Sequence, residues 1–229
     1  MAKKLTKDFT SGSIPKQLFW FALPFMASNA LQVLYSTIDM VIVGNFVGTA
    51  GLSAGSQSRQ IINRITMLCL GISNAGQVLV SQVLGSGKKK ELNSIIGTLF
   101  SIITIFALAL SVIILLGCNW LLNIIKVPPE SFKMAREYLI ICTAGLVFTA
   151  GYNTVSSILR GMGDSKHPFV FISIAAVLNL ILDIVFVGLL GWKESGAAFA
   201  TIISQAVSFI SCSAFLLKNK KQFELNISK

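Results

Sequence analysis

Residues 174–205, IAAVLNLILDIVFVGLLGWKESGAAFATIISQ, place a few polar side chains at regular positions within two apolar segments. Asn179 and Asp183 lie four residues apart, which puts them on one face of a helix. An ionised carboxylate is costly inside a membrane, and such residues usually line a pathway or meet a partner. Asp183 is therefore a candidate functional residue, and the other deeply placed acid, Asp39, has to be considered with it.

The composition favours an integral membrane protein. Of the 229 residues, 54% are hydrophobic and 12% are charged, outside the usual range of a soluble domain. The formal net charge of +10 comes from basic residues between the apolar runs, where chain orientation and anionic lipid headgroups explain them. We therefore expect membrane lipid, and no nucleic acid, among the partners.

Neither an enzyme nor a cofactor site is expected. The lone His167 precedes Pro168 in a polar loop, with no nucleophile, base and orienting group visible together. The four cysteines show no C-x-x-C spacing and lie within or beside apolar runs, which is typical of small buried hydrophobic residues.

Six apolar segments are long enough to cross a hydrocarbon core of about 30 Å. They are residues 17–43, 65–84, 94–117, 138–159, 168–190 and 196–217. The predicted fold class is an all-α membrane protein, a bundle of six transmembrane helices. The chain would divide into an N-terminal segment 1–16, a six-helix lobe 17–217 and a basic tail 218–229. Pro24 lies inside the first segment, where we expect it to act as a hinge.

The loops predict the orientation of this bundle. Six spans place both termini on one side of the membrane. Most of the 19 Lys and Arg residues lie in the N-terminal segment, in the loops after the second and fourth spans, and in the tail. The positive-inside rule therefore predicts a multi-pass protein of the plasma membrane with both termini in the cytoplasm.

In that orientation several polar side chains reach a similar depth. Asp39, Asp183 and Thr201 would lie about 7–10 Å below the outer ends of three different helices, with Asn179 one turn deeper. Carboxylate, amide and hydroxyl oxygens suit Na⁺ or a proton rather than a transition metal. Two adjacent carboxylates in a medium of low dielectric constant need a cation or a proton between them.

The start of the second helix is unusually polar because it carries Arg59, Asn63 and Arg64. These side chains cannot face lipid, so they should face a wet cavity or project above the membrane. The alternative is that Asp39 and Asp183 pair with one of the arginines, or cap a helix end.

Several motifs together resemble the multidrug and toxic compound extrusion (MATE) family. They are ALP at 22–24, DMVIVGNFVG at 39–48, RGMGD at 160–164, the Asn179 and Asp183 pair, and GAAFATIISQ at 196–205. The resemblance covers about residues 13–217. It implies one lobe of a twelve-helix fold with a central cavity, which exports organic cations or drugs in exchange for Na⁺ or H⁺.

The same resemblance implies roles for individual residues. Pro24 matches the bending first helix, whereas Arg59 and Arg64 stand where relatives usually have small or uncharged residues. The positions matching the family's N-lobe cation site are Asp39, Asn179, Asp183, Ala197 and Thr201.

The chain stops after one lobe, while transporters built from two parallel repeats form their cavity from both. We therefore expect a second six-helix lobe, with this chain as a fragment, as a half that pairs with a separate half, or as a homodimer. The expected substrate is a small organic cation or amphiphile. Two alternatives are half of a lipid-linked saccharide flippase and a non-transporting membrane interaction subunit.

Overall fold

The computed structural model describes residues 12–220, with only the backbone described at 89 and 90. This range is helical and contains no strand. The predicted segments 1–16 and 218–229 lie largely outside it, so the proposed division of the chain stays a prediction.

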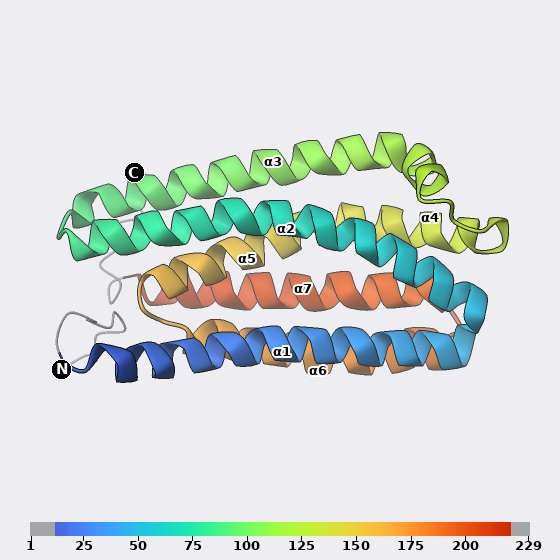
Figure 1. Cartoon of the computed structure of the whole chain (residues 1–229), viewed down its shortest axis with the longest axis horizontal. Helices are drawn as coiled ribbons and strands as arrows, with labels where there is room; N and C mark the ends of the chain where they lie inside the picture. The colour runs from blue at the N-terminus through green and yellow to red at the C-terminus, as the bar shows by residue number, and fades with distance from the viewer. Residues whose placement is uncertain (1–11, 221–229) are drawn as a thin grey trace.

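The helices are long, and the connections between them are short. Helix α1 begins and α7 ends at the same end of the bundle (Figure 1). We call the other end, where α1 meets α2, the α1–α2 end. The elements are α1 (Ile14–Val47), α2 (Thr49–Gly85), α3 (Lys89–Ile124), α4 (Pro129–Ala144), α5 (Leu146–Gly161), α6 (Lys166–Asp183), the π-helical segment η1 (Ile184–Leu189) and α7 (Lys193–Lys218).

Five helices within residues 12–220 are each long and apolar enough to cross a membrane: α1, α2, α3, α7 and the continuous α6–η1. Helices α4 and α5, bent by 46° at the break between them, make a sixth span if they count as one. These findings confirm the predicted class of an all-α membrane protein.

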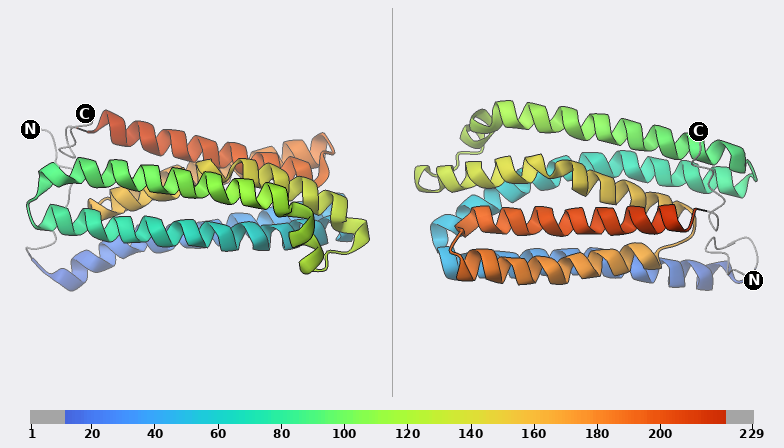
Figure 2. Two further views of the ribbon diagram at one scale, coloured as in Figure 1. Left: turned by 90° about the horizontal axis from the view of Figure 1, so that it is seen from above. Right: turned by 180° about the vertical axis from the view of Figure 1, so that it is seen from behind.

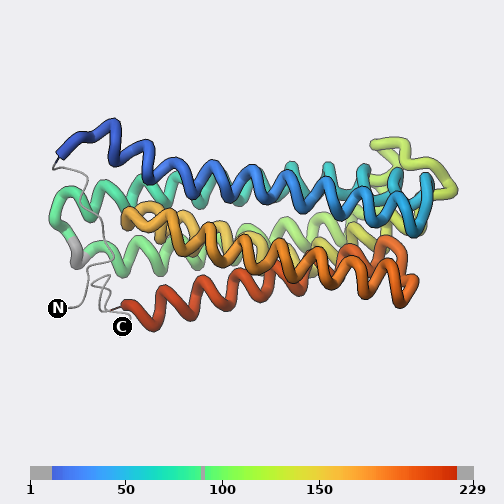
Figure 3. The backbone as a smooth tube through the Cα atoms, turned by 90° about the horizontal axis from the view of Figure 1, so that it is seen from below, coloured from blue at the N-terminus to red at the C-terminus, as the bar shows by residue number. Residues whose placement is uncertain are grey.

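The helices pack in a fixed order that brings distant parts of the sequence together. Helix α1 packs against α6, and α6 against α7. Helix α7 in turn packs on α4 and α5, while α2 packs on α3, α4 and α5 (Figure 2). Seen from below, α1 and α6 run along the same face of the bundle (Figure 3). The acids of α1 and α6 are thereby placed on neighbouring helices.

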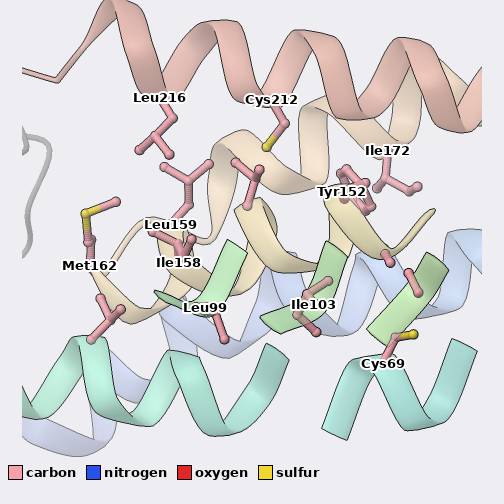
Figure 4. Packing of buried hydrophobic residues seen from close by; sticks show 14 of the residues in the cluster. Cys69, Leu99, Ile103, Tyr152, Ile158, Leu159, Met162, Ile172, Cys212 and Leu216 are labelled. Atoms are coloured by element: carbon pink, nitrogen blue, oxygen red, sulfur yellow. The ribbon is translucent and has the colours of Figure 1, made fainter. Parts of the chain in front are cut away.

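The main apolar core fills the half of the bundle away from the α1–α2 end. It contains buried side chains from α2, α3, α5, α6 and α7, including Leu99, Ile103, Tyr152, Ile158, Leu159, Ile172 and Leu216 (Figure 4). All four cysteines, Cys69, Cys118, Cys142 and Cys212, are buried free thiols, which confirms their reading as small hydrophobic residues.

Several predicted helix boundaries were wrong, including the start of the fourth span, which lies at Pro129 rather than 138. The first span was predicted to end at 43, but α1 continues to Val47 and the turn to α2 is the single residue Gly48, whose φ of 86° is a conformation that favours glycine. Helix α3 continues past 117 to Ile124. The predicted sixth span starts at Lys193 rather than 196, because Gly191 and Lys193, with φ of 67° and 52°, turn the chain tightly.

Pro24 lies inside α1, and helix continues on both sides of it. Proline cannot donate a backbone hydrogen bond, so one carbonyl of the preceding turn loses its usual partner. Ser28 Oγ donates to the carbonyl oxygen of Pro24 at 2.9 Å. The hinge role of Pro24 stays a prediction.

Candidate cation site at the α1–α2 end

The two acids come together where α1 packs against α6. Asp39 is 1% exposed and Asp183 is fully buried. Their carboxyl groups lie close enough for their charges to interact directly. Because two carboxylates this close repel each other strongly in a medium of low dielectric constant, a proton or a cation has to compensate them.

Arg59 supplies part of that compensation. Its guanidinium forms an ion pair with the Asp39 carboxylate and lies 5.6 Å from the centroid of the Tyr138 ring. The rotation of α2 that points Arg59 inward is supported by Ser58, whose hydroxyl donates to the Ala135 carbonyl of α4 at 2.9 Å. The sequence left open the alternative that an arginine neutralises one of the acids, and the structure shows this arrangement for Asp39.

The local charges leave this cluster incompletely balanced. With both acids ionised, two carboxylates and one guanidinium carry one net negative charge. Among residues 12–220, neither oxygen of Asp183 has a hydrogen-bond partner, and Nε of Arg59 is buried without an acceptor. One proton or one monovalent cation would neutralise the cluster and satisfy an oxygen of Asp183.

Three further residues from the predicted site lie on adjoining helix faces. Asn179 is 3% exposed, one turn before Asp183, and its amide nitrogen has no hydrogen-bond partner among the described residues. Ala197 is fully buried in a cluster that also contains Tyr138, while Thr201 is half-buried one turn further along α7. Within the described chain, neither Asn179 nor Thr201 donates a hydrogen bond to either acid.

Asn63 and Arg64 lie on the outside of the bundle. Both are exposed, one turn beyond Arg59, whose side chain is 12% exposed. An amide and a guanidinium on an otherwise apolar helix need water or a second protein surface beside them. Their predicted position facing a cavity stays a prediction.

Sequence reasoning missed one acid near the site. Glu194 is 1% exposed in the first turn of α7 and lies against Gly51 of α2. The predicted spans end at 190 and begin again at 196, so this acid was assigned to the loop between them. An acid followed closely by the helical run from Gly196 is a helix-start pattern that could have revealed it.

A second polar cluster lies at the other end of the bundle, around Arg160 of α5. Its Nε donates to Gln77 Oε1 of α2 at 3.0 Å, and its terminal nitrogens donate to the hydroxyls of Ser156 and Ser157 at 2.6 and 2.8 Å. The guanidinium also lies 5.0 Å from the centroid of the Phe25 ring of α1. This arginine therefore joins α5 to α2 and α1.

A bundle of membrane-spanning helices that buries an acid pair and an arginine is typical of membrane transport proteins. The MatE family model matches residues 24–185, and the chain belongs to this family. Members of the family are transporters rather than enzymes, in agreement with the sequence prediction.

Two curated relatives show how much of a whole transporter is present. The chain is 35% identical over 213 residues to "Probable multidrug resistance protein YpnP" of Bacillus subtilis, covering 93% of this chain and 48% of that protein. It is 27% identical to "Probable multidrug resistance protein NorM" of Thermotoga maritima, covering 93% and 46%. The chain thus spans about half the length of these relatives.

Solved structures show the same fold. A MATE transporter in complex with MaL6 matches with a TM-score of 0.90 at 22% identity, covering all of this chain and 50% of that one. A MOP superfamily transporter from Pyrococcus furiosus matches with a TM-score of 0.89 at 23% identity, covering 99% and 49%. These matches confirm the predicted lobe of a MATE-type fold.

Proposed function

We propose that this chain is the N-terminal lobe of an exporter that expels small organic cations or drugs across the plasma membrane in exchange for Na⁺ or H⁺. Its two termini would lie in the cytoplasm, and the coupling ion would be the only cofactor-like requirement. The names of the multidrug resistance relatives support the substrate class.

The observation that carries this proposal is the buried, incompletely balanced cluster of Asp39, Asp183 and Arg59. A site that needs one more positive charge suits one proton or one Na⁺ per transport cycle. For Na⁺, Asn179, Thr201 and the backbone of Ala197 would add oxygen ligands to those of the acids.

Ion binding would act on transport through α1. This helix carries both Asp39 and Pro24, so a change in the charge of the cluster would alter how the outer half of α1 packs against α6. A bound ion shifts the equilibrium between two states only if its affinity for them differs. We therefore place the coupling in a Pro24 bend that the ion favours or disfavours.

A second lobe would complete the substrate cavity. The exposed Asn63 and Arg64 on α2 support a wet surface there, whether the second lobe comes from the same chain, another chain or a copy of this one. The flippase alternative required free basic residues along the cavity. Of the two candidates, Arg59 is engaged by Asp39 and Arg64 alone stays exposed, so we favour organic cations.

The test replaces Asp183 in a complete two-lobe context, with the chain joined to a second six-helix lobe of the family and reconstituted in vesicles. Asp183→Asn removes one negative charge, so efflux driven by a Na⁺ or pH gradient should fall to the background. The control is Glu91→Gln, which removes the same charge at an exposed acid whose Oε1 lies 4.0 Å from Nζ of Lys88. Gradient-driven efflux that survives Asp183→Asn would reject the proposal.

A further inference from the structure

Glu194 is a buried acid that forms no ion pair with another described side chain. In the part of the chain that the structure describes, no other residue donates a hydrogen bond to either of its carboxylate oxygens. Lys193 precedes it in the chain and attracts it, but the Lys193 side chain is exposed to solvent. Asp39 is close enough to repel it. A carboxylate in such a place requires either a proton or a cation that can reach it.

Helix α2 provides room for this side chain. A Cβ atom on Gly51 would collide with Oε1 of Glu194, and a Cβ on Gly55 would lie 4.0 Å from its Cγ. Gly51 and Gly55 are one turn apart on the buried face of α2. The Glu194 side chain therefore lies in a groove along α2 that is open because residue 51 is a glycine, and Gly55 continues that groove at ordinary contact distance.

Arg59 is the next residue in the same row. It lies one turn, about 6 Å, beyond Gly55. Side chains on a helix lean toward its N-terminus, so Arg59 leans toward the turn that contains Gly55 and the groove of Glu194. An arginine side chain about 6–7 Å long and a glutamate that can rotate within the groove are able to meet there.

The proposed function makes such a second position necessary. A cation that binds between Asp39 and Asp183 would be repelled by the guanidinium now paired with Asp39. Arg59 lies in the interior of the bundle, and moving it without an anion would leave a buried charge unpaired. Glu137, another acid of that region, already accepts a hydrogen bond from Ser195 at 2.9 Å.

We propose that Glu194 is the alternative partner of Arg59, which receives the guanidinium when a cation occupies the pair formed by Asp39 and Asp183. This proposal rests on the proposed function for its cation, but not for the exchange between two acidic partners. Glu194 is a positioning residue in this scheme because it acts on the cation site through Arg59. A bound cation would then be accompanied by a shift of one arginine along α2.

The first experiment needs no Na⁺. The thermal unfolding midpoint of the full chain in detergent micelles is measured in choline buffer, for Asp39→Asn/Asp183→Asn, for Glu194→Gln and for the three changes combined. Either set alone leaves Arg59 an acidic partner, whereas the combination leaves none. The combined variant should lose about 5 °C or more beyond the sum of the two sets.

Two controls make this cycle specific. In an Arg59→Gln background the excess loss should disappear, because no guanidinium remains to be stranded. The second control uses Glu130→Gln in place of Glu194→Gln, because Glu130 is an exposed acid in the first turn of α4. Its effect on the unfolding midpoint should simply add to that of Asp39→Asn/Asp183→Asn. Losses that add within about 1 °C in the Arg59 protein would overturn the exchange.

The second experiment uses Na⁺ alone as the probe. Glu194→Gln should raise the Na⁺ concentration for half-maximal thermal stabilisation about tenfold, because Arg59 then stays on Asp39. In the Arg59→Gln background, Glu194→Gln should leave this Na⁺ concentration unchanged. An equal tenfold change in both backgrounds would mean that Glu194 acts on Na⁺ directly and would overturn the role given to Arg59.

The two experiments separate the inference from the proposed function. The combined variant could lose more of its unfolding midpoint than the sum of the separate changes while Na⁺ stabilises none of the variants. This result would support the two partners of Arg59 and count against Na⁺ coupling. Stabilisation by Na⁺ with additive losses in the cycle would support the cation site and overturn the role of Glu194.

Discussion

Two arginines are held inside the bundle by opposite means. Arg160 donates hydrogen bonds to three neutral side chains, Gln77, Ser156 and Ser157, on two helices. Arg59 forms one ion pair with Asp39 and leaves its Nε without an acceptor. The first guanidinium has a fixed set of partners, and the second lies in a cluster whose charges do not balance.

The difference indicates that Arg160 holds helices together, whereas Arg59 responds to changes in nearby charge. Neutral partners give Arg160 no reason to move when charges change, and its contact with Phe25 holds α1 next to Pro24. The partners of Arg59 are acids, whose attraction depends on any proton or cation bound there. The Arg160 end should therefore respond to mutation through stability, and the Arg59 end through ion dependence.

The largest expected effect is at the anchor. Arg160→Ala removes three hydrogen bonds of a charged group and should lower the free energy of unfolding by about 3 kcal/mol. The unfolding midpoint in detergent should fall by about 6–12 °C, equally in Na⁺ and choline buffers. A drop confined to choline would break the distinction between the two arginines. Arg136→Ala, at an arginine that contacts Asn119 on the surface, is the matched control.

Asp164 should show the next largest effect, at the same end. Its Oδ1 accepts hydrogen bonds from the backbone N–H groups of Lys166 and His167, both at 3.2 Å, in the first turn of α6. Asp164→Ala should cost about 1–2 kcal/mol, as for loss of a helix cap. Asp164→Asn keeps an acceptor and should recover most of the loss. Equal losses in the two variants would show that the charge matters more than the cap.

Arg59→Gln should have a smaller effect that depends on ions. Its loss leaves Asp39 and Asp183 short of one more positive charge, which bound Na⁺ can partly supply. The free energy of unfolding should fall by only about 1 kcal/mol in high Na⁺, and by more in choline. A variant equally stable in both buffers would show that the acid pair does not respond to cations.

The smallest effect should come from Arg64, the exposed arginine on the same helix. Arg64→Gln should change the unfolding free energy by less than about 0.5 kcal/mol in either buffer, because no buried partner is lost. The same thermal unfolding measurement checks it. A large loss would mean that Arg64 has a partner within this lobe.

The fold was largely predictable because membrane spans are defined by length and apolar composition, which the sequence states directly. The break between Ala144 and Leu146 was not. It depends on packing, since a Cβ on Gly145 would collide with the side chain of Ile202 from α7. A contact between residues so far apart in the chain leaves no mark in local composition.

The meeting of Asp39 with Asp183 could be expected from their equal depth. The direction of Arg59 could not, because α2 is polar on several sides near its start. Only its packing on α4, through Ser58, decides that Arg59 points inward while Asn63 and Arg64 point outward. Glu194 was missed for a related reason, as a charged residue after Gly191 and Trp192 is typical of a loop.

The π-helical segment 184–189 directly after Asp183 accommodates more residues per turn than an α-helix. Deleting one residue there would let the segment return to an ordinary α-helix, because a π-helical turn holds about one residue more than an α-helical turn. The residues on either side would then keep nearly the same orientation, including Trp192, which stacks on Phe186 with ring centroids 5.1 Å apart. A homologue shorter by one residue in this stretch would therefore keep both the acid pair and the residue that faces the groove of α2.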